Sequence, residues 1–162
     1  MREDDFREFA LTRGPSLSRT AYLLTGDHHL AEALVQAALV QAAKHWERIE
    51  TSPEAYVRRA MYHQNISWWR RRKLAETPLA SYDAPAPAAD PTLRLTLEQA
   101  LRRLTPRQRT VLVLRYFEDL TEVQTAAALG ISSGAVKSMA RQALQRLRVL
   151  APELADLVGA DA

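Results

Sequence analysis

The sequence predicts an all-α protein of two small helical domains, joined by a proline-rich linker, with a helix-turn-helix in the second domain. Nearly every periodic segment repeats its apolar residues at helical spacing, and strict apolar–polar alternation is almost absent. The stretch from Glu76 to Pro91 holds four prolines and little that could pack in a core. At 162 residues and 47% apolar residues, the chain suits two small cores.

These features divide the chain into four parts. Residues 1–74 are predicted to form a helical domain, 75–91 a flexible linker, 92–150 the helix-turn-helix domain and 151–162 a short acidic tail. We expect the two domains to move independently about the linker unless a partner holds them.

The first domain is predicted to contain three helical segments. Gly14-Pro15 should break or kink the first, between Asp5 and Leu24, because proline lacks the N–H that a helix needs. Asp27 is a good N-cap for the second, about His28 to Trp46. The third opens near Ser52-Pro53, where an N-cap residue precedes a proline at the first helical position.

The second domain has strong local signals for helix ends. Thr105-Pro106-Arg107-Gln108 and Thr121-Glu122-Val123-Gln124 are capping boxes, in which each side chain bonds the other's backbone N–H. The first of these helices should continue to the turn at Glu118-Asp119-Leu120. The second should end with Gly130 as a left-handed C-cap, and Ser132 should cap the last helix.

The last helix is predicted to be amphipathic. Its buried side should comprise Val136, Met139 or Ala140, Ala143, Leu144 and Leu147. A short helix, a turn with glycine and a second helix with a basic outer face form a helix-turn-helix, whose second helix enters the major groove of DNA. The outer face is therefore predicted to bind DNA through Ser133, Lys137, Ser138, Arg141, Gln142 and, at the phosphates, Arg146.

The net charge of +3 is unevenly distributed. Six basic residues and no acid lie between Ala55 and Ala75, and four basic residues and no acid lie between Val123 and Pro152. Two basic tracts indicate two contacts with a polyanion. The first tract also places Trp68 and Trp69 beside arginines, a mixture typical of proteins that stack the bases of separated strands. The alternative is that both tryptophans pack and the arginines form a cationic helix end.

Several classes of protein are excluded by composition. The absence of cysteine excludes disulfides and thiolate metal sites and favours the cytoplasm. No apolar run approaches the roughly 20 residues that span a bilayer, so no membrane insertion is expected. The sequence has no phosphate-cradling loop and no recognisable nucleophile, so we expect no enzyme, no cofactor and no small-molecule substrate. We interpret His28-His29 beside Glu32 as helix surface, with no metal.

Several of these segments together resemble the extracytoplasmic-function (ECF) sigma factors of the sigma-70 family, in particular the actinobacterial type. Asp27 to Trp46 is similar to the second conserved helix of sigma region 2. The promoter-melting part of region 2 resembles residues 53–59 and 66–72 (PEAYVRR and ISWWRRR). Region 4 resembles residues 104–109, 113–121 and 136–138 (LTPRQR, VLRYFEDLT and VKS).

The resemblance implies binding to core RNA polymerase and to promoter DNA. Region 4 would read the −35 element as duplex with the helix from Ser133 onward. Region 2 would open the −10 element and hold its non-template bases, through His63, Asn65, Trp68, Arg70, Arg71 and Arg72. Region 2 would bind the polymerase clamp through Glu32, Val35, Gln36 and Leu39. An anti-sigma factor is a further partner expected from the habit of the family.

The chain departs from the family at three positions. Ala33 and Ala37 stand where the polymerase-binding helix usually carries acids, so only Glu32 and Gln36 remain of that polar strip. His63 stands where an asparagine is usual. None of these departures affects region 4.

Two other functions fit part of the sequence. Residues 104–147 also resemble the helix-turn-helix of response regulators, so a stand-alone transcriptional regulator is the alternative function. Residues 1–74, however, lack the alternating strands and helices of a receiver domain. A helical adaptor that binds only protein would leave both acid-free tracts unexplained, and its behaviour toward DNA would be independent of salt.

Overall fold

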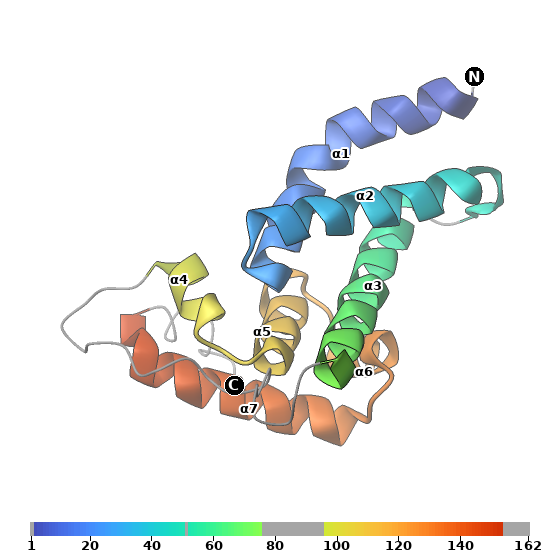
Figure 1. The fold of residues 1–162 in the computed structure, drawn as a ribbon. Helices are drawn as coiled ribbons and strands as arrows, with labels where there is room; N and C mark the ends of the chain where they lie inside the picture. The colour runs from blue at the N-terminus through green and yellow to red at the C-terminus, as the bar shows by residue number, and fades with distance from the viewer. Residues whose placement is uncertain (1, 51, 76–95, 154–162) are drawn as a thin grey trace. The chain divides into compact units, whose positions relative to one another are not determined.

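The computed structural model describes residues 2–50, 52–75 and 96–153. The regular elements in these residues are all helical, as predicted (Figure 1). The chain divides into two compact units, Met1–Arg70 and Arg71–Ala162. None of the described helices is long and apolar enough to cross a membrane. The predicted linker, 75–91, falls outside the described residues except for Ala75, and most of the tail 151–162 also falls outside them.

Unit 1 begins with α1 (Arg2–Thr25), which runs through Pro15 without a break. The ribbon of α1 changes direction part-way along its length (Figure 1). The break that the sequence left open is therefore absent, and the proline is accommodated by a bend, which is what the loss of one backbone hydrogen bond produces. The fully buried residues of α1 all follow the proline, and they include Leu17, Ala21 and Leu24.

The first half of α1 is held by an aromatic cluster. The ring of Phe6 lies edge-on to Trp46 with 5.3 Å between centroids, and the ring of Phe9 lies 5.5 Å from the same indole. Such aromatic pairs add to the stabilisation that their buried area provides.

The turn from α1 into α2 (His28–Lys44) follows the predicted local chemistry. Gly26 adopts a φ of 70°, and the Leu30 N–H donates to Asp27 Oδ1 at 2.9 Å, which confirms Asp27 as the N-cap. The predicted helix extends too far, to Trp46. Helix α2 ends at Lys44, and Trp46 belongs to a separate 3₁₀ turn, η1 (Trp46–Arg48). The two long helices α1 and α2 pack side by side (Figure 1).

Helix α3 (Pro53–Ala75) begins at the predicted proline, and its residues up to Arg70 belong to unit 1. The Ala55 N–H donates to Ser52 Oγ at 3.4 Å, as expected for a serine cap. The core between the three helices is apolar, and its fully buried side chains include Leu17, Leu24, Leu34, Val57 and Met61.

Unit 2 contains α4 (Leu97–Arg102), α5 (Pro106–Leu112), η2 (Val113–Phe117), α6 (Glu122–Leu129) and α7 (Ser133–Leu150). The capping boxes of Thr105 and Thr121 are both present, as predicted. Helix α4 was not predicted, although Thr96 and Gln99 form a third capping box. The Thr96 N–H donates to Gln99 Oε1 with 2.9 Å between nitrogen and oxygen, and the Gln99 N–H donates to Thr96 Oγ1 with 3.2 Å. That box was a readable signal in the sequence.

The predicted helix does run from Pro106 to the turn, but its second half is π-helical. The α-helix ends at Leu112, and η2 is a π-helical turn closed by the Glu118 N–H on the Val113 carbonyl at 2.9 Å. Asp119 then adopts a φ of 55°, and the Arg115 side chain donates to the Leu120 carbonyl at 2.6 Å. Helix α7 packs on α5 and α6 over a core that includes Leu101, Val111, Leu114, Val136 and Leu147.

Candidate nucleic-acid interface

Helices α6 and α7 form a helix-turn-helix with a three-residue turn. Gly130 is left-handed, at φ 69° and ψ 35°, and its N–H donates to the Ala126 carbonyl. The Gly130 bond is the 5→1 bond of an αL cap, and the Ile131 N–H also donates to the Ala126 carbonyl, at 3.1 Å, as in the 6→1 bond of a Schellman motif. Ser132 then accepts from the Ala135 N–H at 3.1 Å and starts α7. Local backbone chemistry therefore determines the geometry of this turn.

Helix α7 is amphipathic, with its buried and exposed residues on opposite sides. Its buried side is Val136, Ala140, Ala143, Leu144, Leu147 and Leu150, so Ala140 takes the core position for which the sequence had left Met139 open. The exposed side carries five of the six residues predicted to contact DNA, Ser133, Lys137, Ser138, Arg141 and Gln142. The sixth, Arg146, is half-buried, and its Nε atom lies inside the fold.

The exposed side of α7 is also electropositive. No acid lies between Val123 and Pro152. Lys137 and Arg141 are exposed, and within the described part of the chain neither forms an ion pair. A surface of this kind can donate to base edges and neutralise phosphates.

The second basic tract lies on α3, and the structure divides its residues. His63, Arg70 and Arg71 are exposed, and Trp68 is half-buried. Asn65 is only 8% exposed and lies in the interior of unit 1, and its contact with DNA stays a prediction. The side chain of Arg72 lies outside the described residues.

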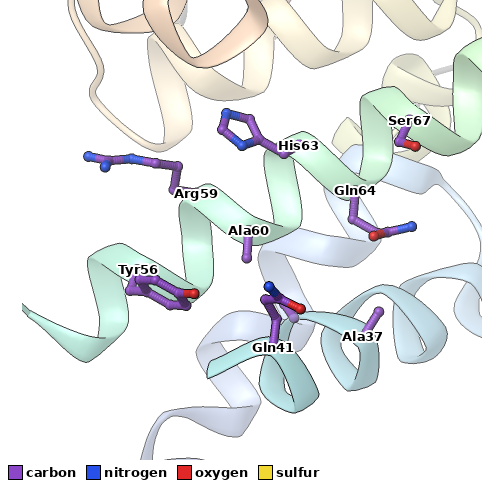
Figure 2. Close-up of a pocket in the computed structure, with 9 residues that line it drawn as sticks. Ala37, Gln41, Tyr56, Arg59, Ala60, His63, Gln64 and Ser67 are labelled. Carbon is purple, nitrogen blue, oxygen red and sulfur yellow. The ribbon is translucent and has the colours of Figure 1, made fainter. Parts of the chain in front are cut away.

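A groove runs between α2 and α3 beside His63. Its volume is about 470 Å³, and its walls come from Ala37, Ala38, Gln41, Tyr56, Arg59, Ala60, His63, Gln64 and Ser67. Figure 2 shows Gln41 and Ala37 on the α2 side, whereas Arg59 and His63 point away from α2. Gln41, Tyr56 and Gln64 were not predicted as site residues, because no local sequence pattern shows that two separate helices form one groove.

The predicted polymerase-binding residues of α2 do not share one environment. Glu32 and Gln36 are exposed, and Leu39 is half-buried. Val35 is only 5% exposed and packs in the core, and its contact with the polymerase stays a prediction. On the same helix, Val40 is 52% exposed.

His28, at the start of α2, makes an aromatic contact with α1. Its ring stacks on that of Tyr22 at 4.3 Å between centroids with 12° between planes. This contact joins α1 and α2 across the Gly26-Asp27 turn. Among the described residues, no three acids or histidines gather as they would around a metal ion.

Family models match both units of the chain. The model for sigma-70 region 2 matches residues 10–74, and the model for sigma-70 region 4 matches residues 100–149. Residues 10–74 therefore occupy the place where a response regulator would carry its receiver domain.

Individual relatives agree with these matches. The RNA polymerase sigma-E factor of Streptomyces coelicolor is 41% identical over 152 residues, covering 89% of this chain and 84% of that protein. The ECF RNA polymerase sigma factor SigL of Mycobacterium tuberculosis is 32% identical and covers 85% of this chain and 84% of that protein. A crystal structure of the sigma factor RpoE from Bartonella quintana, in complex with the anti-sigma factor NepR, shares the fold at a TM-score of 0.64 and 24% identity, over 98% of this chain and 99% of that chain. The chain belongs to the sigma-70 family of RNA polymerase sigma factors, and ECF sigma factors are among its relatives.

Proposed function

We propose that the protein is a sigma factor that binds core RNA polymerase and directs transcription initiation at promoters with −35 and −10 elements. The observation that carries this proposal is the exposed basic face of α7, in a helix-turn-helix whose chain also matches sigma region 2. The polymerase supplies the chemistry, so we assign no catalytic residue and no cofactor. This role places the protein in the cytoplasm.

The −35 element is proposed to be read by α7. Ser133, Lys137 and Ser138 lie in its first turns, where a recognition helix meets base edges. Arg141 and Gln142 follow one turn later and are exposed. Arginine and lysine donate to guanine, and glutamine pairs with adenine, so this face carries groups that distinguish bases. The half-buried Arg146 is better placed for phosphate.

The separated non-template strand of the −10 element is proposed to bind α3. Exposed Arg70 and Arg71 attract its phosphates, and the half-buried Trp68 offers a ring for stacking. The groove beside His63 adds the amide groups of Gln41 and Gln64, which can hydrogen-bond to the edge of an unstacked base.

Polymerase binding is proposed for the exposed side of α2. Glu32 and Gln36 supply its polar contacts, and Leu39 adds a half-buried apolar one. An anti-sigma factor is the further partner that we expect, since the Bartonella quintana sigma factor of the same fold was solved in complex with one.

Run-off transcription tests this function. Purified core RNA polymerase is given fragments of the native genome, with and without the protein, and the transcripts are mapped. We expect new, discrete start sites whose upstream sequences share two elements, and we expect Lys137→Ala with Arg141→Ala to lose the starts that depend on the −35 element. Specific binding to duplex DNA without any transcript would instead indicate a stand-alone regulator.

A further inference from the structure

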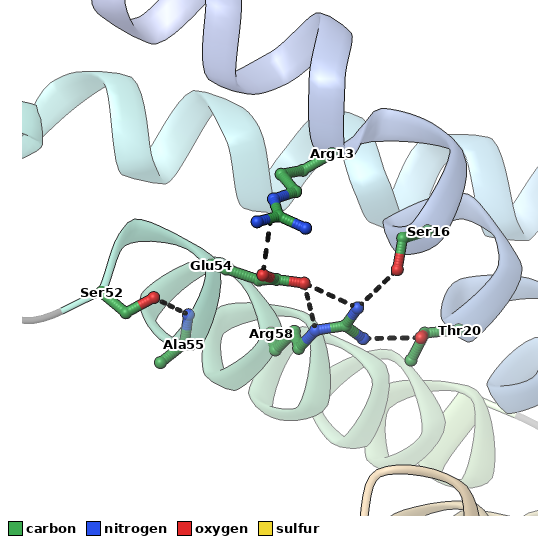
Figure 3. A network of polar contacts seen from close by, with 7 residues as sticks. All are labelled: Arg13, Ser16, Thr20, Ser52, Glu54, Ala55 and Arg58. Atoms are coloured by element: carbon green, nitrogen blue, oxygen red, sulfur yellow. Dashed lines mark hydrogen bonds and ion pairs between the residues drawn. The ribbon is translucent and has the colours of Figure 1, made fainter.

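Arg58 belongs to the acid-free tract of α3, yet its side chain is turned into unit 1. Its Nη1 donates to Thr20 Oγ1 at 2.6 Å, and its Nη2 donates to Ser16 Oγ at 2.8 Å (Figure 3). Nη2 and Nε also donate to Glu54 Oε1, at 3.0 and 3.3 Å. The side chain is only 18% exposed. All three nitrogens of the guanidinium are therefore engaged inside the unit.

The partners of Arg58 lie around the bend of α1. Ser16 and Thr20 follow Pro15 directly and one turn later, and Arg13 precedes it. Glu54, at the start of α3, also pairs with Arg13 Nε at 3.7 Å. Because Pro15 cannot donate a backbone hydrogen bond, the helix's own backbone constrains this bend less than the rest of α1. The side-chain network joins both sides of the bend to the first turns of α3.

The next residues of α3 face elsewhere. Arg59 is exposed and lines the groove with His63, one turn further along. Successive helical residues point about 100° apart, so α3 is attached to α1 on one side while it presents the neighbouring side to a ligand. Its angle to α1 thus determines where Arg59 and His63 lie.

We propose that Arg58 is a positioning residue for −10 recognition: it holds α3 at a fixed angle on bent α1 and makes no contact with DNA itself. This inference rests on the proposed function. Arginine is required because its planar fork serves acceptors in several directions, whereas lysine offers a single ammonium group.

The test compares Arg58→Gln, Arg58→Lys and Arg59→Gln in the holoenzyme on a promoter found by run-off transcription. Promoter opening is followed by the permanganate reactivity of −10 thymines, together with polymerase affinity and the salt dependence of DNA binding. We expect both Arg58 variants to open the promoter roughly tenfold less, the equivalent of one hydrogen bond to a charged group, with unchanged polymerase affinity and salt slope. Arg59→Gln should reduce the salt slope by about one if Arg59 meets a phosphate.

Three results would overturn the proposal. Rescue by Arg58→Lys, with a reduced salt slope in Arg58→Gln, would make Arg58 a phosphate contact. Normal opening by a less heat-stable Arg58→Gln would make its role purely structural. If Arg58→Gln does not fold, Thr20→Val and Ser16→Ala remove its two acceptors on α1 singly, and normal opening by both variants would equally overturn the proposal. A wild-type protein that yields no transcripts would instead contradict the proposed function.

Discussion

Thr125, in α6, has a buried hydroxyl group in an apolar environment. The residue is fully buried, and its Oγ1 has no hydrogen-bond partner among the described residues. A buried hydroxyl without a partner loses its hydration and gains nothing in return. The methyl group of the same side chain packs in the core, so the shape of the residue suits the fold and its polarity does not.

We therefore expect Thr125→Val to stabilise the protein by about 1 kcal/mol, because valine keeps the shape and removes the unsatisfied hydroxyl. Urea unfolding followed by circular dichroism measures the change. Thr125→Ala is the matched control, and it should be less stable than Thr125→Val because it leaves a small cavity. A loss of stability in Thr125→Val would show that the hydroxyl has a partner in solution.

Arg141 is the exposed residue of α7 best suited to a base contact. Arg141→Ala is expected to lower affinity for the −35 duplex by about tenfold or more and to relax preference at one base pair, because the proposed bidentate contact with a base would be lost. Binding of the holoenzyme to a set of duplexes with single base changes measures both effects.

The control for Arg141 is Arg148, which is exposed further along the same helix. Arg148→Ala should weaken binding to every duplex equally and reduce the salt slope by about one, as expected for a phosphate contact. An unchanged preference for the −35 sequence in Arg141→Ala would show that Arg141 does not contact a base.

At the scale of the element, the start of α2 depends on one carboxylate. The hydrogen bond from the Leu30 N–H lowers the pKa of Asp27 from its usual 3.8, and the nearby His28 and His29 act in the same direction. A lowered pKa means that the folded state favours the charged form. The stabilisation is therefore complete above pH 3.8 and is lost as the pH falls through the folded-state value.

The variant Asp27→Asn keeps a cap but has no titrating group. We expect the wild type to be more heat-stable than Asp27→Asn at pH 6 and this advantage to disappear as the pH falls below 3.8. Thermal unfolding of both proteins between pH 6 and pH 3 measures it. An advantage that stays constant over this range would mean that the charge of Asp27 does not stabilise α2.

The helix-turn-helix offers a pair of glycines with opposite requirements. Gly130 needs its left-handed φ of 69°, so Gly130→Ala should destabilise unit 2 by about 1 kcal/mol. Gly134 lies in α7 with ordinary helical backbone, and a Cβ there would meet only Ser132 Oγ at 3.9 Å. Gly134→Ala should therefore stabilise the helix by roughly 0.5 kcal/mol. Chemical unfolding compares the two variants, and an equal effect of both would contradict this account of the turn.

At the scale of the whole molecule, the two units are expected to unfold separately, because each has its own core. Differential scanning calorimetry should resolve two transitions. Thr125→Val should move only the transition of unit 2, and Arg58→Gln only that of unit 1. A single transition that both substitutions shift would show that the units form one cooperative structure.

The sequence by itself determined the fold class and the helix ends that carry a local capping signal. Asp27, Thr105, Thr121, Gly130 and Ser132 all act as predicted, because a cap involves backbone groups within a few residues of the capping side chain. The exposed face of α7 was predictable for a related reason: helical periodicity separates its apolar side from its basic side.

Only the tertiary structure decided which residues of α2 and α3 remain available. Val35 and Asn65 are buried, and Arg58 is held by α1, although the sequence pattern allowed each of them to face solvent. The groove of Gln41 and Gln64 exists only because α2 and α3 lie next to one another. The physical reason is that burial and pairing depend on the helix packed opposite, whose identity is not encoded in the local sequence, whereas a cap or a helical face is complete within one segment.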